Sequence, residues 1–310
     1  MAEHIVINDV GPRDGLQNQA KLLNVDERLQ LIRALVDANV TNIEAGAFVS
    51  PKAVPAMAGC AEIIQGLAAM PMAAKDNATE LSVLIPNIKG YELALNAGVK
   101  TVAMVLYASE GMAIKNVGMT RQEADLAAVE IIRRAKTDNI SVIATVSVAF
   151  ECPFDGPTDP AIVCAAASKF LELGVSSVVI ADTIGAANPM QVSELMRALV
   201  AENDALGLAC HFHDTRALGL ANVYAAVEAG IRRFDASIAG LGGCPFAPGA
   251  SGNIATEDAV MMLHSMGFDT GIDLPKLLDA SDLAEQLTGI SCGGRSKPWL
   301  KPHLMKNAVA

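Results

Sequence analysis

The chain has 310 residues, with 23 Lys or Arg against 34 Asp or Glu, so its formal net charge is −11. Hydrophobic residues make up 52% of it, which is enough apolar material for a sizeable core and argues against intrinsic disorder. The longest unbroken apolar runs, Val102–Ala108 and Ala161–Ala167, fall short of the roughly 20 residues of a membrane-spanning helix, which excludes an integral membrane protein. The acidic balance also disfavours a nucleic-acid-binding protein.

The predicted elements alternate between short β-rich segments and amphipathic helical segments. Eight such pairs predict parallel strands with helical crossovers, and we expect an α/β fold, a (β/α)8 TIM barrel with a short C-terminal helical extension. In chain order, strand then helix, the pairs are Ile5–Asp9 and Asp26–Ala38, Asn42–Ala45 and Lys52–Gly66, Leu81–Pro86 and Ile88–Asn96, Thr101–Tyr107 and Arg121–Thr137, Ile140–Ala149 and Pro160–Leu173, Ser177–Ala181 and Pro189–Ala201, Leu206–His211 and Ala217–Ala229, and Arg233–Ala236 and Thr256–Met266.

We expect one domain over residues 1–290, C-terminal helices included, and a tail over residues 291–310. The tail is basic, and we interpret it as a solvated terminus, with a lid or a subunit contact as the alternative. The residues after Met1 lack the charged and apolar regions of a presequence, and none of the six cysteines forms a C-x-x-C pair. We therefore expect a cytoplasmic protein with reduced thiols.

Polar residues cluster just after the predicted strands, where a barrel enzyme has its active site. His211 and His213 are two apart on a strand, so both imidazoles point to one side of it. With Asp14 as the best carboxylate candidate and Asn253 as a further oxygen donor, they could hold a divalent metal, Mg²⁺ or Mn²⁺. The alternative for each histidine is a capping role in a helix or loop.

Four more residues at strand ends or in loops are candidates for catalysis. Arg13 could stabilise negative charge on a carbonyl oxygen, or form a surface ion pair. Glu44 could orient Arg13 or a water at the metal, or make a plain salt bridge. Asp182 could be a general base or the N-cap of the next turn. Cys244 lies in a Gly-rich loop that could be a mobile flap, or it could be an inert turn residue.

Several of these segments together resemble the 3-hydroxy-3-methylglutaryl-CoA lyase family of DRE-TIM metallolyases. The resemblance runs from about residue 4 to residue 288, nearly the whole chain. Its motifs are Gly11–Asn18 (G-P-R-D-G-L-Q-N), Phe48–Lys52 (F-V-S-P-K), Asp182–Gly185 (D-T-I-G), His211–Thr215 (H-F-H-D-T), Gly240–Pro245 (G-L-G-G-C-P) and Gly249–Asp258.

The resemblance implies a metal-dependent retro-Claisen cleavage of 3-hydroxy-3-methylglutaryl-CoA, an acyl-CoA thioester, to acetyl-CoA and acetoacetate, by a homodimer. By position, Asp14, His211, His213 and Asn253 match the metal ligands. Arg13 matches the residue that holds the thioester carbonyl and stabilises the enolate, and Gln17 is assigned to substrate binding beside it. Glu44 matches a residue that supports Arg13 and the metal site, Asp182 one implicated in proton transfer, and Cys244 the flap thiol.

Departures from the family pattern affect the acyl group that is accepted. Ala45-Gly46-Ala47 follows the strand-2 Glu where family members often have hydroxylated residues, and Arg216-Ala217-Leu218 replaces a common Tyr-Gly-Gln. A lyase for a citramalyl-type or longer-branched 3-hydroxyacyl-CoA is therefore an alternative. A condensing synthase of the isopropylmalate or homocitrate type is disfavoured by the short C-terminal segment. A non-catalytic binding barrel is the third alternative, and it would require the polar residues at the strand ends to be there by coincidence.

Overall fold

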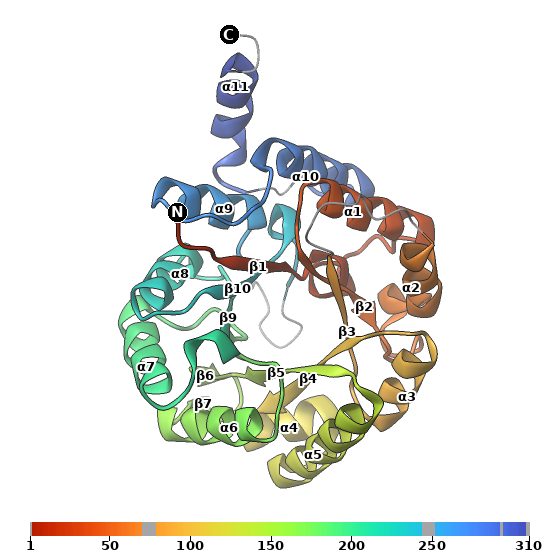
Figure 1. Cartoon of the computed structure of the whole chain (residues 1–310), viewed down its shortest axis with the longest axis vertical. Coiled ribbons are helices and arrows are strands. Elements are labelled where there is room, and N and C mark those ends of the chain that lie inside the picture. Colours follow the sequence, from red (N-terminus) through yellow and green to blue (C-terminus); the bar gives the residue numbers. More distant parts are fainter. Residues whose placement is uncertain (1, 70–78, 244–251, 292–293, 308–310) are drawn as a thin grey trace.

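Eight parallel strands close into a barrel, as predicted (Figure 1). The computed structural model describes residues 2–69, 79–243, 252–291 and 294–307. Around the barrel the strand order is β1-β10-β9-β8-β5-β4-β3-β2. The strand bounds are β1 Val6–Asp9, β2 Asn42–Ala47, β3 Glu80–Leu84, β4 Thr101–Tyr107, β5 Ser141–Ser147, β8 Ser177–Asp182, β9 Leu208–Phe212 and β10 Arg233–Ala236.

Helices surround the barrel, and their starts follow from local side-chain chemistry. Asn24, Thr120 and Asn188 each form a capping box with the Glu or Gln three residues later, which satisfies backbone N–H groups at the helix start. The helix bounds are α1 Val25–Asp37, α2 Cys60–Ala68, α3 Ile88–Asn96, α4 Glu110–Val117, α5 Arg121–Asp138, α6 Pro160–Glu172, α7 Pro189–Glu202, α8 Gly219–Glu228, α9 Thr256–Ser265, α10 Leu274–Thr288 and α11 Lys297–Asn307. No helix in these described ranges is long and apolar enough to cross a membrane.

The strand registers decide which side chains point into the barrel. His211 pairs with Asp235, Asp235 with Asn8, and Asn8 with Asn42. Paired residues on neighbouring parallel strands face the same side, and successive residues alternate. All four side chains therefore face the interior, whereas Cys210 faces the surrounding helices and contacts Met196 of α7.

The segment after β2 differs from the prediction. We expected a helix over Lys52–Gly66, but α2 begins at Cys60, after a 3-10 turn at Pro55–Met57. The buried guanidinium of Arg28 donates hydrogen bonds to the carbonyl oxygens of Ala56 and Ala58, which holds this stretch in a non-α conformation. The structure also adds α4 and a small hairpin, β6 Glu151–Cys152 with β7 Gly156–Pro157, that the sequence pattern did not indicate.

The C-terminal segment contains a helix. Residues Lys297–Asn307 form α11, which extends outward near α10 (Figure 1), and the interpretation of the segment as a solvated terminus stays a prediction. The start of the segment is fixed to the barrel because Glu257 accepts a hydrogen bond from Gly294 N at 2.8 Å and Asp258 accepts one from Arg295 N at 2.7 Å. The two carboxylates thus satisfy backbone N–H groups at the start of this segment. The composition of the segment gave no indication of these contacts.

Candidate active site

A single helical turn after β1 positions Arg13 and Asp14 at the barrel mouth. It spans Gly11–Gly15, and the amide groups of Asp14 and Gly15 both donate to the carbonyl oxygen of Val10. A Cβ atom on Gly11 would lie 2.7 Å from Asp9 Oδ1, so this close approach requires glycine. Asp9 in turn accepts a hydrogen bond from Gly11 N at 2.8 Å, which fixes the direction in which the turn leaves the strand.

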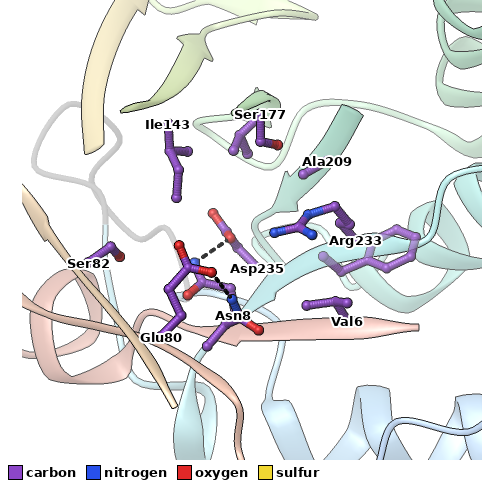
Figure 2. A pocket seen from close by; sticks show the side chains of 12 residues that line it. Val6, Asn8, Glu80, Ser82, Ile143, Ser177, Ala209, Arg233 and Asp235 are labelled. Carbon is purple, nitrogen blue, oxygen red and sulfur yellow. Dashed lines mark hydrogen bonds between the residues drawn. The ribbon is translucent and has the colours of Figure 1, made fainter. Parts of the chain in front are cut away.

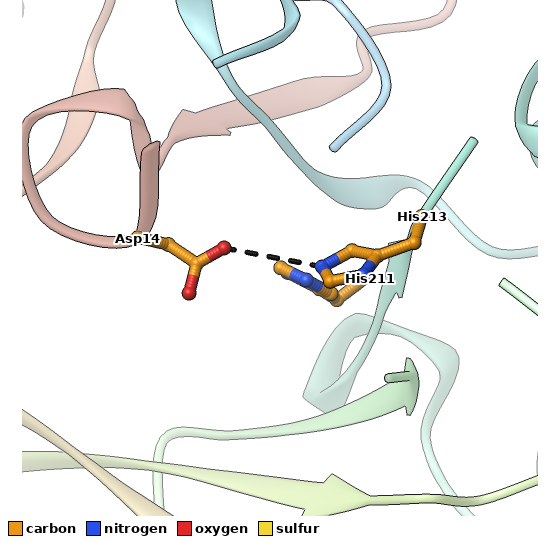
Figure 3. A group of neighbouring side chains, drawn as sticks. All are labelled: Asp14, His211 and His213. Carbon is orange, nitrogen blue, oxygen red and sulfur yellow. Dashed lines mark ion pairs between the residues drawn. The ribbon is translucent and has the colours of Figure 1, made fainter. Parts of the chain in front are cut away.

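Asp14, His211 and His213 form a buried cluster (Figure 3). Their ligand atoms all lie within 4.8 Å of one another, and His213 Nε2 is 3.9 Å from Asp14 Oδ2. Asp14 comes from the turn after β1, and the two imidazoles come from β9 and the residue that follows it. The prediction that these three residues meet is confirmed.

Asn253 joins this cluster. Its amide nitrogen donates to Asp14 Oδ2 at 2.8 Å and to the carbonyl oxygen of Leu241 at 3.1 Å. A backbone bridge pairs Asn253 with His213, so the two side chains share one position along the barrel. Among the described residues, Asn253 Oδ1 and His213 Nδ1 are buried without a hydrogen-bond partner. An amide oxygen without a partner beside a carboxylate and two imidazoles fits a cation that prefers mixed nitrogen and oxygen ligands.

The protonation states of Asp14 and His213 suit a metal site, whereas for His211 burial is outweighed by Asp235 and Asp14, which raise its pKa. Burial alone would raise the pKa of Asp14, but Arg13 and the two histidines outweigh it and lower that pKa to about 2. Burial and the neighbouring His211 lower the pKa of His213 to about 4. At neutral pH Asp14 is therefore an anion and His213 is neutral, which are the forms that bind metals.

Arg13 is held between two carboxylates. Its Nε donates to Glu44 Oε2 at 2.6 Å and its Nη1 donates to Asp14 Oδ1 at 2.7 Å. Burial would lower the pKa of Arg13, but Glu44 and Asp14 more than offset this and raise it. Its Nη2 has no hydrogen-bond partner within the described part of the chain, which leaves a donor for another group. Glu44 therefore contacts Arg13, as predicted.

The structure gives the other predicted site residues unequal support. Gln17 donates to Asp14 Oδ1 at 3.1 Å and so lies at the cluster. Asp182 pairs in register with the outward-facing Phe212, and it accepts hydrogen bonds from Ala186 N at 2.8 Å and Ala187 N at 3.0 Å. These two hydrogen bonds are those of a residue that caps the next turn, which was the alternative role for Asp182. A role of Asp182 in proton transfer stays a prediction. Cys244 lies outside the described residues.

Sequence reasoning missed Asp235. Its Oδ2 lies 3.1 Å from His211 Nδ1, and its Oδ1 accepts a hydrogen bond from Asn8 at 2.8 Å. Figure 2 shows Asp235 and Asn8 beside a cavity of about 30 Å³ that Arg233 and Ser177 also line. The signal was present, because Asp235 alternates inward on a predicted strand beside the strand that carries His211.

The opposite wall of the mouth is uncharged. The registers of β3, β4, β5 and β8 direct Leu84, Val105, Thr145 and Ala181 into the barrel. Leu84, Val105 and Thr145 are half-buried, so some of their surface stays open within the barrel. Any molecule bound at the cluster would meet aliphatic and hydroxyl groups on this side.

Comparisons with known proteins agree with this geometry. A family model described as HMGL-like matches residues 4–284. The hydroxymethylglutaryl-CoA lyase of Pseudomonas mevalonii is 41% identical over 270 residues, which cover 87% of this chain and 88% of the relative. The (R)-citramalyl-CoA lyase of Chloroflexus aurantiacus is 41% identical over 284 residues, 90% of each chain. An HMG-CoA lyase structure from Acinetobacter baumannii, in complex with coenzyme A and 3-methylmalate, superposes with a TM-score of 0.88 at 38% identity and covers 94% of each chain. The chain therefore belongs to the HMGL-like family and is a lyase of that family.

Proposed function

We propose that this lyase cleaves 3-hydroxy-3-methylglutaryl-CoA to acetyl-CoA and acetoacetate with the help of a divalent cation, Mg²⁺ or Mn²⁺. One observation carries the proposal. The guanidinium of Arg13 is fixed 2.7 Å from Asp14, a carboxylate that lies within 4.8 Å of two buried imidazoles, and its Nη2 has no hydrogen-bond partner among the described residues. Cleavage of a 3-hydroxyacyl thioester needs both a fixed cation at the thioester oxygen and a site that favours loss of the hydroxyl proton.

Asp14, His211, His213 and Asn253 would hold the cation. When bound, it supplies Lewis acidity, which makes the tertiary hydroxyl of the substrate easier to deprotonate. The chain's own contribution is to orient these four side chains, through the turn after β1 and the backbone bridge between His213 and Asn253. The same turn sets Arg13 beside them.

Arg13 would receive the negative charge that forms on the thioester oxygen. When the C2–C3 bond breaks, its electron pair passes into the thioester carbonyl and gives an enolate. Arg13 Nη2 can donate a hydrogen bond to that oxygen while Nε and Nη1 stay bound to Glu44 and Asp14. The enolate carbon then takes a proton, and we assign the proton transfers to Asp182 and Cys244 from the family resemblance.

A related acyl-CoA is the second candidate substrate. The relatives named for hydroxymethylglutaryl-CoA and for (R)-citramalyl-CoA have the same 41% identity to this chain. The uncharged wall of Leu84, Val105 and Thr145 would suit a branched aliphatic group as well as a methyl group. A citramalyl-type or longer-branched 3-hydroxyacyl-CoA is therefore kept beside the first candidate.

A panel of 3-hydroxyacyl-CoA thioesters, assayed with Mg²⁺ by mass spectrometry, tests the proposal. We expect release of acetyl-CoA, with the highest kcat/KM for 3-hydroxy-3-methylglutaryl-CoA. Excess chelator should abolish the reaction, and Mg²⁺ or Mn²⁺ should restore it. Full turnover in chelator would remove the metal from the mechanism, and a preference for citramalyl-CoA would select the second substrate. The homodimer and the cytoplasmic location stay predictions.

A further inference from the structure

We infer that Asp235 is a positioning residue that holds His211 in a single tautomer, with the proton on Nδ1 and the lone pair of Nε2 directed at the Asp14 cluster. The inference rests on the proposed metal site, because its benefit is a correctly oriented metal ligand. Asp235 lies outside the family motifs of this chain.

The contact between the two side chains is close and sheltered. Asp235 Oδ2 lies 3.1 Å from His211 Nδ1, and both side chains are about nine-tenths buried. Asp235 is directly paired with His211 in the register of β9 and β10. A carboxylate accepts hydrogen bonds and cannot donate them, so the facing ring nitrogen must carry the proton. In the neutral form of the ring, the other nitrogen, Nε2, then keeps its lone pair.

Asp235 is itself held in place from the other side. Asn8 donates a hydrogen bond to Asp235 Oδ1 at 2.8 Å, and the two residues are paired in the register of β1 and β10. The two carboxylate oxygens thus have separate partners, one from β9 and one from β1. Figure 2 shows the contact with Asn8 of β1. The carboxylate plane cannot rotate without losing one of these hydrogen bonds. Rigid support of this kind sets the orientation of the imidazole ring.

His213 supplies a contrast within the same site. Its Nδ1 is buried and has no hydrogen-bond partner among the described residues. Its backbone is paired with that of Asn253, and its ring lies beside that of His211, with the two ring centroids 5.1 Å apart. Removal of Asp235 should therefore affect His211 and leave the tautomer of His213 unchanged. The two histidines form a matched pair of a supported and an unsupported ligand.

The experiment compares the parent protein with Asp235→Ala and Asp235→Asn. The first readout is the ¹⁵N NMR spectrum of the imidazole nitrogens in metal-free, ¹⁵N-histidine-labelled protein, which has five histidines to assign. We expect the parent to show His211 with a protonated Nδ1. In Asp235→Ala the His211 nitrogens should shift toward a mixture of tautomers, and the His213 signals should stay in place. Asp235→Asn keeps the shape, but its amide nitrogen can donate where the carboxylate oxygen accepted, so the His211 proton should move toward Nε2.

The second readout is the Kd for Mn²⁺, measured by calorimetry. Loss of an outer partner of a metal-bound histidine weakens metal affinity by about 10–100-fold, and we expect Asp235→Ala to fall in that range. Asn8→Ala, which leaves the contact to His211 intact, should weaken it less. Circular dichroism and thermal unfolding show whether each variant folds. If Asp235→Ala does not fold, the spectrum of Asp235→Asn decides the test.

An unchanged His211 tautomer in folded variants that lack the Asp235 carboxylate would overturn the inference. Failure of the proposed function looks different. A parent protein that binds no Mn²⁺ would still show the dependence of His211 on Asp235 in its NMR spectrum. The tautomer readout therefore judges the positioning role, and the Mn²⁺ readout judges the metal site.

Discussion

The two sides of the barrel mouth differ in the side chains that they direct inward. The strands β9, β10, β1 and β2, with the turn after β1, bring histidines, carboxylates and Arg13 together, and all of these except His213 are hydrogen-bonded to a neighbour. At the mouth, the strands β3, β4, β5 and β8 direct uncharged side chains inward, among them Leu84, Val105 and Thr145, whereas Glu80 of β3 faces inward at the other end of the barrel. We infer that the first side performs the chemistry and the second side fits the acyl group.

This division has a physical reason. A buried charge is costly unless it is paired and hydrogen-bonded, so each charged group on the reactive side depends on its partners. Replacement of one partner leaves another charge without compensation. Uncharged side chains on the opposite wall carry no such dependence, and substitutions there change the volume and shape of the pocket. The reactive side should therefore tolerate few changes, and the opposite wall should tolerate several.

Substitution of Arg13 by Met gives the largest expected effect. The change removes the donor at the thioester oxygen, and loss of one such donor lowers kcat by about 10²–10³-fold. Steady-state kinetics of Arg13→Met and of Leu84→Met, a matched change on the opposite wall, measures it. A kcat of Arg13→Met within about tenfold of the parent would contradict the division of the mouth.

Substitution of Asn253 by Ala should weaken metal binding. It removes both the unpartnered amide oxygen and the 2.8 Å hydrogen bond to Asp14. We expect the Kd for Mn²⁺ to rise by at least the roughly 10–100-fold that follows loss of an outer partner. Calorimetry measures the Kd, with Thr145→Val as the control on the uncharged side. Equal Kd values for the two variants would remove Asn253 from the predicted ligand set.

Enlargement of the uncharged wall should change substrate preference more than turnover. Leu84→Ala makes room beside the acyl group, and a difference of one methylene in an apolar pocket changes discrimination by roughly 10–200-fold. The ratio of kcat/KM for a longer-branched substrate to that for 3-hydroxy-3-methylglutaryl-CoA should rise toward that range. A ratio that stays constant would show that this wall does not contact the acyl group.

The smallest predicted effect concerns Asp9, which lies beneath the reactive turn. Burial raises the pKa of Asp9 to about 7, despite hydrogen bonds from Thr256 and Gly11. In the unfolded chain this carboxyl releases its proton near its ordinary pKa of 3.8. Between these values the unfolded state binds fewer protons, so stability falls as the pH rises from about 4 to about 7.

Asp9→Asn removes this titration and keeps an acceptor for Gly11 N. The variant should therefore gain stability relative to the parent as the pH is raised from 5 to 8. Urea unfolding at the two pH values measures the difference. A stability difference between variant and parent that is the same at pH 5 and pH 8 would show that Asp9 is ionised throughout.

Much of the barrel and part of the site could be predicted from the sequence. Strands of regular spacing predicted the barrel, and the alternation rule placed His211 and His213 on one side of a strand. The local sequence pattern could not show contacts between residues that lie far apart in the sequence. Arg28, 28 positions from Ala56, interrupts a predicted helix. Asp258, 37 positions from Arg295, fixes the start of α11. For Asp182 the sequence left two alternatives, a general base or an N-cap. Its carboxylate accepts a hydrogen bond from the next turn, which is the geometry of the N-cap.

The hydrogen bond between Asn253 and Asp14 joins residues 239 positions apart, across the point where β10 meets β1. The reactive centre is thus assembled where the first and last strands of the barrel join. A nascent or truncated polypeptide that stops before β10 lacks Asn253, one of the four proposed ligands, and also lacks Asp235, however well its earlier strands have formed. Catalytic competence therefore requires closure of the barrel, because the side chains that complete the site come from both sides of the junction.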